Sequence, residues 1–239
     1  MQQSKITILS TRTIDHPLIR EAASNTIIVD SISFIKTEPI SSIEKQQEIE
    51  HLATMQVSVI FTSVNAVEAV AGDLEGYQPG WQIFCIGYAT RDAVEKFFGK
   101  KSIAETAPNA EDLAKAIITK AEADEVIFFC GDQRRDELPN ILRSADIEVN
   151  EIIVYHTVAI PQKVEKKYNG ILFFSPSAVR SFFQENKPGD ETVLFAIGDT
   201  TANELRQIAG NKIIVSSKPD TENLLNEMVT YFQKNRIHH

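Results

Sequence analysis

The sequence predicts an α/β fold made of two similar domains, each with a doubly wound parallel sheet, joined by a two-stranded linker. Short apolar runs typical of buried strands alternate along the 239 residues with segments of helical periodicity. The chain also repeats its own layout, because the stretch 84–114 reads like the stretch 195–225, with Gly87 and Gly198 placed 111 residues apart. A layout that is present twice indicates two domains of similar fold.

The individual elements follow from these two periodicities. Strands are expected at 5–10, 26–35, 57–62, 82–86, 103–105, 125–130, 149–159, 170–174, 192–197 and 212–216. Helices are expected at 15–23, 42–54, 64–71, 90–98, 110–121, 135–144, 177–185, 200–209 and 221–234. Their alternation along the chain predicts layers of helices packed on parallel strands.

The repeat also predicts the domain boundaries. The segment 59–70 (VIFTSVNAVEAV) matches 171–182 (ILFFSPSAVRSF), and 25–31 (NTIIVDS) matches 150–156 (NEIIVYH). The strands of the second pair are long, so we expect them to cross between the domains. The expected boundaries are 1–35 with 160–239 for a discontinuous domain, 38–150 for an inserted domain, and about 30–37 and 151–159 for the linker strands.

Composition and charge narrow the class of protein. The formal net charge of −9 argues against a nucleic-acid partner, but it leaves an anionic small molecule open because local geometry can outweigh net charge. No apolar run approaches the ~20 residues of a membrane span, and the N-terminal residues lack a signal-peptide layout. Cys85 and Cys130 lie in expected strands, so we expect buried free thiols. These features predict a cytoplasmic protein without a membrane partner, and we expect it to be a monomer.

Polar residues follow the expected strands at their carboxyl ends, where doubly wound sheets bind ligands. These candidate binding residues are Arg12, Ser63, Asn65, Gly87, Thr90, Arg135, Ser175, Gly198, Thr200 and Thr201. A purely structural interpretation also exists, in which Ser175 caps a helix, Thr201 forms a capping box with Glu204, and the glycines supply tight turns. Taken together, helix N-termini from two domains facing one cleft would suit a large ligand with several carboxylates or phosphates.

Familiar catalytic patterns are missing from the sequence. It contains no GxGxxG, GxxxxGK[ST], GxSxG or HExxH motif, and its five histidines show no metal-ligand spacing. We therefore expect no metal and no cofactor. Tyr155 is the one polar aromatic residue at an expected domain crossing, where a tyrosine packed at a hinge is the structural alternative to a functional role.

Six motifs in order resemble the uroporphyrinogen-III synthase family. They are FTSVNAV (61–67), CIGYATRDAV (85–94), CGDQRRDELPNIL (130–142), VYHT (154–157), FFSPSAV (173–179) and AIGDTTANEL (196–205). The resemblance implies two α/β domains joined by a two-stranded ladder, and a substrate, hydroxymethylbilane, that is a linear tetrapyrrole rich in carboxylates. It also implies a cofactor-free reaction in which the bilane loses water and closes with its terminal ring inverted.

The resemblance assigns roles residue by residue. Tyr155 matches the tyrosine of the V-Y-x-T segment and is the candidate acid, while Ser63 and Asn65 match the T-S-x-N-A turn. The remaining matches are Arg135, which follows the glycine of CGDQRR by four residues, and Gly198, Thr200 and Thr201 of the I-G-x-T-T turn. Asp146 stands where family members often have glycine, and the role of Arg134 is left open. A non-catalytic two-domain protein that binds an anionic small molecule stays open as the alternative.

Overall fold

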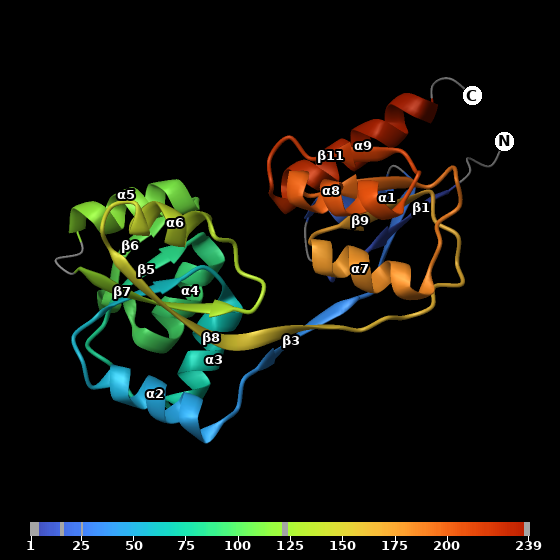
Figure 1. The fold of residues 1–239 in the computed structure, drawn as a ribbon. Coiled ribbons are helices and arrows are strands. Elements are labelled where there is room, and N and C mark those ends of the chain that lie inside the picture. The colour runs from blue at the N-terminus through green and yellow to red at the C-terminus, as the bar shows by residue number, and fades with distance from the viewer. Residues whose placement is uncertain (1–4, 15–16, 25, 121–123, 237–239) are drawn as a thin grey trace. The chain divides into compact units, whose positions relative to one another are not determined.

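The computed structural model describes residues 5–14, 17–24, 26–120 and 124–236, which form two compact α/β units (Figure 1). Unit 1 comprises residues 1–36 and 158–239, and unit 2 comprises residues 37–157. The chain therefore passes from one unit to the other twice. The α/β fold with parallel sheets confirms the predicted fold class.

Unit 1 is built on a five-stranded parallel sheet. Its strands are β1 (Ile6–Ser10), β2 (Ile27–Ser31), β9 (Gly170–Phe173), β10 (Val193–Ala196) and β11 (Ile213–Val215), in the order β11-β10-β9-β1-β2. Its helices are α1 (Pro17–Ser24), α7 (Pro176–Glu185), α8 (Asp199–Ile208) and α9 (Thr221–Arg236). One face of the sheet packs against α9 through Leu225 and Met228, and the other packs against α7 and α8 through Phe182 and Leu205. Helices on both faces make this sheet doubly wound.

Unit 2 is built on a six-stranded sheet with helices on both faces. Its strands are β3 (Ile35–Pro39), β4 (Ser58–Phe61), β5 (Gln82–Ile86), β6 (Ile103–Ala107), β7 (Glu125–Gly131) and β8 (Glu148–Ala159), in the order β3-β8-β7-β4-β5-β6. Its helices are α2 (Ile43–Ala53), α3 (Val64–Asp73), α4 (Tyr88–Phe98), α5 (Ala110–Lys120) and α6 (Glu137–Arg143), with a 3₁₀ turn at Lys100–Ser102.

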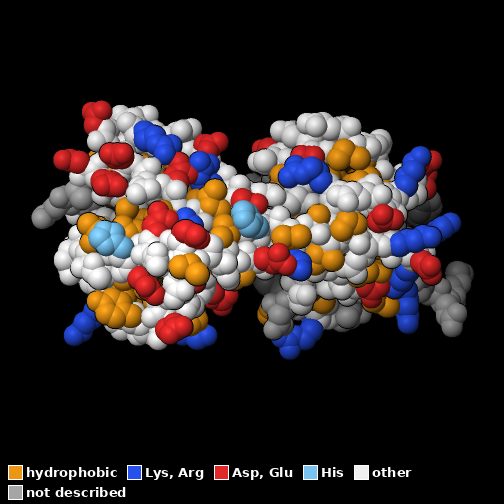
Figure 2. All heavy atoms as spheres, turned by 60° about the horizontal axis from the view of Figure 1, so that its bottom comes forward, with side chains coloured by type: hydrophobic (Ala, Val, Ile, Leu, Met, Phe, Trp, Pro, Cys, Tyr) orange, Lys and Arg blue, Asp and Glu red, His pale blue; other side chains and the backbone are white. Residues whose placement is uncertain are grey.

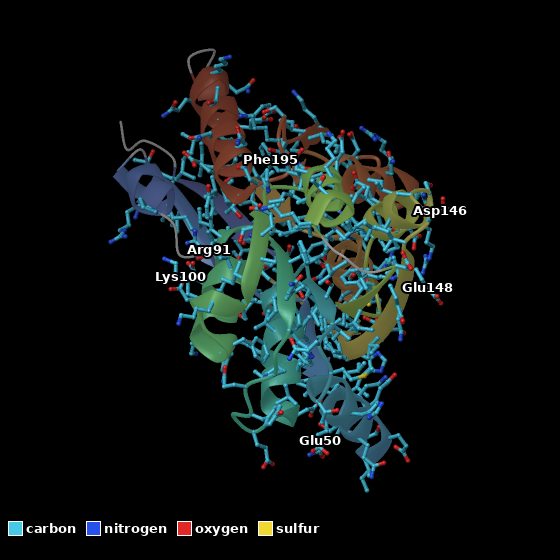
Figure 3. The ribbon with its side chains drawn as sticks, turned by 90° about the vertical axis from the view of Figure 1, so that its left-hand side faces the viewer. Glu50, Arg91, Lys100, Asp146, Glu148 and Phe195 are labelled. Carbon is cyan, nitrogen blue, oxygen red and sulfur yellow. The ribbon has the colours of Figure 1, made fainter. Side chains whose placement is uncertain are left out.

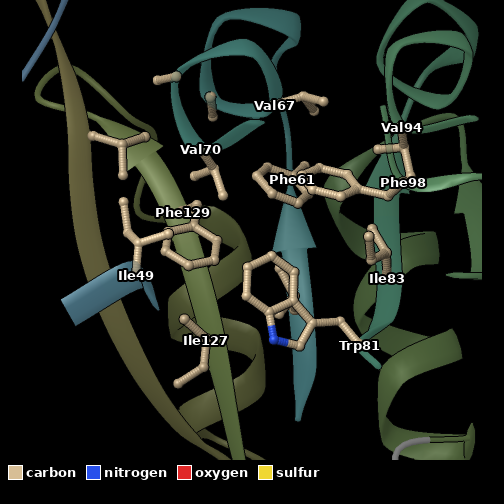
Figure 4. Close-up of a cluster of buried hydrophobic side chains, with 14 of the residues drawn as sticks. Ile49, Phe61, Val67, Val70, Trp81, Ile83, Val94, Phe98, Ile127 and Phe129 are labelled. Atoms are coloured by element: carbon tan, nitrogen blue, oxygen red, sulfur yellow. The ribbon is translucent and has the colours of Figure 1, made fainter. Parts of the chain in front are cut away.

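An aromatic cluster fills one face of the unit 2 sheet, beneath α2, α3 and α4 (Figure 4). The ring of Phe61 stacks on Phe98 and Phe129 at centroid distances of 6.0 and 5.5 Å, and Trp81 lies 5.6 Å from Phe129. The Trp81 indole N–H donates to the carbonyl of Leu52 at 2.9 Å, so its polar atom is satisfied within the core. This packing holds the carboxyl ends of β4 and β7 in fixed positions.

The two sheets have the same strand order once the sequence repeat is taken into account. The repeat makes β1, β2, β9, β10 and β11 equivalent to β7, β8, β4, β5 and β6, and both sets are arranged in the same spatial order. Unit 1 therefore combines two strands from the first half of the chain with three from the second half, whereas unit 2, which has β3 as an additional strand, combines four from the first half with two from the second. Neither half alone contains all strands of either sheet.

The expected strand 26–35 was wrong as a single element. The structure divides this stretch into β2, which pairs with β1 in unit 1, and β3, which neighbours β8 in the sheet of unit 2. The break occurs at Phe34, whose fully buried ring lies 5.1 Å from the ring of Phe182. The other expected strands and helices agree with the observed bounds to within two residues, although 15–16 and 121 lie outside the described residues.

Acidic and basic side chains are interspersed on the face shown in Figure 2, so that face does not present one uniform sign of charge. Among the helices that the structure describes, none is both long enough and apolar enough to cross a membrane.

Candidate functional site

The carboxyl edge of each sheet contains a point where the strand order reverses. In unit 1 this point lies between β1 and β9, and in unit 2 it lies between β4 and β7. The loops that leave two adjacent strands in opposite directions open a crevice at such a point, and ligands of doubly wound folds bind there.

In unit 2, Ser63 and Tyr155 meet at the reversal point. Ser63 follows β4 as the N-cap of α3, and its Oγ accepts the backbone N–H of Ala66 at 3.2 Å. Tyr155 lies in β8 beside Gly131, the last residue of β7. The Tyr155 hydroxyl oxygen is 3.2 Å from Ser63 Oγ, so the two hydroxyls are hydrogen-bonded across the end of the sheet.

The next helix of this edge begins without a capping side chain. Gly87 is the N-cap of α4 and has a φ of 82°, a left-handed conformation that favours glycine. The first N–H groups of α4 thus receive no side-chain oxygen from the N-cap residue, which leaves them available to an anion. Thr90, in the first turn of α4, is only 5% exposed, whereas Asn65 in the first turn of α3 is half-buried.

Two adjacent arginines follow β7 and have different surroundings. Arg134 is paired with Asp136 and with Glu151 of β8, and Glu151 also accepts from Arg143 Nη2 at 2.6 Å. Arg134 is therefore part of an ion-pair network with side chains of its own unit, which gives it a structural contact that the sequence did not indicate. Arg135 is exposed, and no ion pair to it is found among the residues that the structure describes.

In unit 1, Arg12 lies at the reversal point between β1 and β9. Its guanidinium stacks on the ring of Phe174 at 4.1 Å, and its Nη2 donates to Thr221 Oγ1 at 2.6 Å. Loss of hydration on burial lowers the pKa of Arg12 from its ordinary value, but an arginine stays charged at neutral pH. Ser175, the residue after Phe174, caps α7 by accepting the N–H of Ala178 at 3.2 Å. A fixed cation thus lies near a capped helix start.

The second helix start of this edge again lacks a capping side chain. Gly198 is the N-cap of α8, with extended backbone, and makes no side-chain cap. Thr200 is exposed, whereas Thr201 is only 2% exposed. The capping box expected between Thr201 and Glu204 is wrong, because Thr201 is the third residue of the helix and Glu204 accepts from Arg180 Nη1 at 2.8 Å.

Open volume and the expected site residues do not coincide within unit 1. A hollow of about 650 Å³ lies at the opposite edge of its sheet, lined mainly by residues 163–169 and 185–192. None of the expected site residues lines it. The strand ends are the better candidate site, because the polar groups and the helix starts without capping side chains gather there.

A metal site finds no support in the described part of the chain, which contains no group of three or more His, Cys, Asp or Glu residues able to hold an ion. Cys85 and Cys130 are both buried and free, and burial raises the pKa of both thiols, that of Cys130 to about 11. Both therefore stay protonated and unreactive at neutral pH.

Sequence reasoning missed three residues of these edges. Gly131 makes room for the Tyr155 ring, while Phe174 and Thr221 hold the Arg12 guanidinium. A glycine at the end of a buried strand was the available signal for the first, because glycine is unfavourable in a strand unless another group approaches closely. Nothing in the local sequence links Arg12 to Thr221, which is 209 residues away.

Comparisons with known proteins agree with this arrangement. A family profile described as uroporphyrinogen-III synthase HemD matches residues 17–226. The uroporphyrinogen-III synthase of Saccharomyces cerevisiae is 26% identical over 176 residues, which cover 62% of this chain and 64% of the yeast protein. That of Schizosaccharomyces pombe is 25% identical over 166 residues, covering 64% of each. The chain thus spans slightly less than two thirds of the length of these two curated relatives.

Solved structures share the fold over nearly the whole chain. Uroporphyrinogen-III synthetase from Helicobacter pylori has a TM-score of 0.68 at 16% identity, with 95% of this chain and 99% of that chain covered. A mutant uroporphyrinogen III synthase from Thermus thermophilus has a TM-score of 0.59 at 14% identity, with 98% and 100% covered. From the profile match over most of its length, the chain belongs to the uroporphyrinogen-III synthase family.

Proposed function

We propose that this chain is a uroporphyrinogen-III synthase, a lyase that cyclises hydroxymethylbilane to uroporphyrinogen III in haem biosynthesis, with loss of water and inversion of the terminal pyrrole ring. The profile match over residues 17–226 carries the proposal. The enzyme acts as a cytoplasmic monomer on this small molecule, without a cofactor, a nucleic acid or a membrane.

Substrate binding is distributed over the carboxyl edges of both sheets. The starts of α4 and α8, where Gly87 and Gly198 provide no capping side chain, offer backbone N–H groups to substrate carboxylates. Arg12 and the exposed Arg135 add positive charge, and Thr200 adds an exposed hydroxyl. Ser63, Asn65 and Ser175 lie at neighbouring helix starts, whereas Thr90 and Thr201 shape the same helices mainly from buried positions.

Tyr155 is the acid of the first step. The bond between the terminal carbon and its hydroxyl oxygen breaks, the electron pair leaves with the oxygen, and the phenol proton completes a water molecule. The resulting electron-poor azafulvene is attacked by the last ring at its substituted carbon, which gives a spiro intermediate. That ring is released, inverted and rejoined, and the proton lost on closure restores the phenol. The protein contributes positioning and charge stabilisation to the later steps.

Incubation with freshly prepared hydroxymethylbilane tests the proposal. Without an enzyme the bilane closes spontaneously to the type I isomer, so chromatography of the oxidised products should show the type III isomer with the folded chain and type I with the urea-unfolded chain. A two-domain protein that only binds anions would leave type I unchanged. Type I product alone from the folded chain would therefore refute the synthase assignment.

A further inference from the structure

The Tyr155 ring occupies the space that a side chain on Gly131 would need. A Cβ atom added to Gly131 would lie 2.4 Å from Tyr155 Cζ, 2.5 Å from Cε2 and 2.7 Å from the hydroxyl oxygen. The φ of Gly131 lies outside the left-handed region, so its backbone conformation does not require glycine. Tyr155 is therefore the structural reason for glycine at this position.

The ring crosses the end of β7 to reach its partner. Strand β7 lies between β8, which carries Tyr155, and β4, which leads into Ser63. The phenol oxygen and Ser63 Oγ are nevertheless 3.2 Å apart, because the ring passes over Gly131 where no Cβ obstructs it. The Tyr155 hydroxyl is thus positioned by two contacts: the ring lies against Gly131, and the hydroxyl oxygen is hydrogen-bonded to Ser63.

The hydrogen-bonding capacity of Ser63 favours one direction for this contact. A serine hydroxyl has one proton to donate and two lone pairs. One lone pair of Ser63 Oγ already accepts the N–H of Ala66 at 3.2 Å, and the hydroxyl proton has no other acceptor among the contacts of the described residues. When Ser63 donates to the phenol oxygen, the Tyr155 proton is left for another acceptor, and the same donor stabilises the negative charge that forms when this proton is transferred.

We propose that Gly131 and Ser63 are positioning residues for Tyr155: Gly131 leaves the passage for the ring, and Ser63 donates to the phenol oxygen so that the phenol proton faces the substrate. The catalytic part of this inference rests on the proposed synthase function, whereas the geometric part does not. The two parts are therefore tested with separate measurements on the same variants.

The geometric part is tested by nuclear magnetic resonance of protein labelled with ¹³C at tyrosine Cζ. The described residues include Tyr77, Tyr88, Tyr155, Tyr168 and Tyr231, and loss of a signal in Tyr155→Phe assigns the resonance of interest. Gly131→Ala and Ser63→Ala should each move the Tyr155 signal and leave the other four in place. An unmoved Tyr155 signal in both variants overturns the proposal.

Ser42→Ala is the matched control for Ser63→Ala. Ser42 caps α2 by accepting the N–H of Lys45 at 3.1 Å, so it makes the same capping bond but is exposed and contacts no tyrosine hydroxyl. Loss of this cap should leave the Tyr155 signal and turnover unchanged. A Ser42→Ala variant that moved the Tyr155 signal as far as Ser63→Ala does would mean that loss of a cap alone explains the result, which also overturns the proposal.

The catalytic part is tested by a double-mutant cycle in type III product formation. Gly131→Ala should lower turnover to about the level of Tyr155→Phe, and the double variant should fall within about threefold of Tyr155→Phe. A double variant far below Tyr155→Phe means that Gly131 acts independently of the phenol, which overturns the positioning role. If Tyr155→Phe keeps the turnover of the parent, the catalytic role proposed for Tyr155 is wrong. The shift of the Tyr155 ¹³C signal in Gly131→Ala then decides whether Gly131 positions the ring.

If Gly131→Ala does not fold, the same substitution is tested in Tyr155→Ala protein, which lacks the Tyr155 ring. In Tyr155→Ala protein the atoms that a Cβ at position 131 would meet are absent, so adding Gly131→Ala should not change the melting temperature. A large further loss of melting temperature in that background would show that glycine is needed for another reason, against the proposal.

Discussion

Replacing Tyr155 by phenylalanine separates a catalytic phenol from a structural one, because the ring and its packing remain. The substitution removes the hydrogen bond to Ser63, a neutral contact at 3.2 Å in a partly buried place. Ser63 Oγ keeps its bond from the Ala66 N–H, and its hydroxyl proton, which loses the phenol as acceptor, is partly exposed and can donate to water. We therefore expect the free energy of unfolding to fall by only ~0.5–1 kcal/mol, the lower part of the range for such bonds.

Turnover should respond much more strongly than stability. A positioned general acid contributes ~10²–10⁴-fold to rate, so type III product formation by Tyr155→Phe should fall by about 10²-fold or more. Thermal melting and product formation are measured on the same purified protein. Turnover within about threefold of the parent would refute the acid role and leave binding at the helix starts to account for catalysis.

Tyr168→Phe is the matched control for this experiment. The Tyr168 hydroxyl donates to Asp30 Oδ2 at 2.9 Å, and burial together with this contact raises the pKa of Tyr168 to about 12. Hydrogen bonds to a charged group contribute ~1.5–3 kcal/mol, with the lower end expected here because Asp30 is partly exposed. Tyr168→Phe should therefore lose more stability than Tyr155→Phe while keeping its turnover. Equal losses of turnover in the two variants would refute the reasoning.

Three further outcomes follow from the contacts of single residues. Arg135→Ala should lower turnover by about tenfold or less and leave the melting temperature unchanged. Arg134→Ala should mainly lower the melting temperature, because it removes one ion-pair partner of Glu151, whose side chain is 14% exposed. The reverse pattern would contradict a binding role for Arg135 and a structural role for Arg134. Asp146→Gly should raise the free energy of unfolding by about 0.5 kcal/mol, because Asp146 has a φ of 59° in the turn between α6 and β8 (Figure 3). The gain should be measured as a higher urea midpoint, and a lower midpoint would argue against backbone strain at Asp146. Burial raises the pKa of Cys130 from 9.0 to about 11, so as the pH rises the thiol ionises in the unfolded chain before it ionises in the folded chain. The free energy of unfolding should therefore fall between pH 9 and 11, and it should fall less in Cys130→Ala. Equal losses of urea midpoint in the parent and the variant would exclude this thiol as a cause.

The elements were predictable from sequence wherever one local periodicity decided them. Helix starts at Ser63 and Ser175 follow from the residues around them, since an N-cap is a local interaction. The prediction for the stretch 26–35 failed because apolar residues resume after the polar residues 30–31, so one long strand fitted the pattern, while the chain leaves one sheet and enters another near Phe34. That change depends on the buried ring of Phe182, which is 148 residues further along the chain and leaves no mark in the local pattern.

The candidate site could be placed at strand ends from the sequence, but its side-chain contacts could not be predicted. Parallel strands bring their carboxyl ends to one edge, so the sequence was enough to place Ser63 there, whereas Tyr155, which lies within β8, was predicted only at a domain crossing. The distinction between Arg134 and Arg135 was not predictable, because it depends on Glu151 in the neighbouring strand. The passage over Gly131 likewise depends on the pairing of β7 with β8.

The two copies of the repeated frame carry different polar side chains at their carboxyl edges. Both units place a serine-capped helix and a helix start without a capping side chain at the carboxyl edge, so the arrangement that we propose to bind carboxylates is present twice. The repeat aligns Tyr155 with Asp30, whose carboxylate is instead bound by Lys166 and Tyr168. Unit 1 has the stacked guanidinium of Arg12 at its reversal point in place of a phenol. A substrate with many carboxylates needs several anion sites, whereas loss of one hydroxyl needs a single proton donor. Two similar units, of which only unit 2 has a tyrosine at its reversal point, therefore fit the proposed reaction better than anion binding alone. Binding anions alone would not require a phenol in one unit and not in the other.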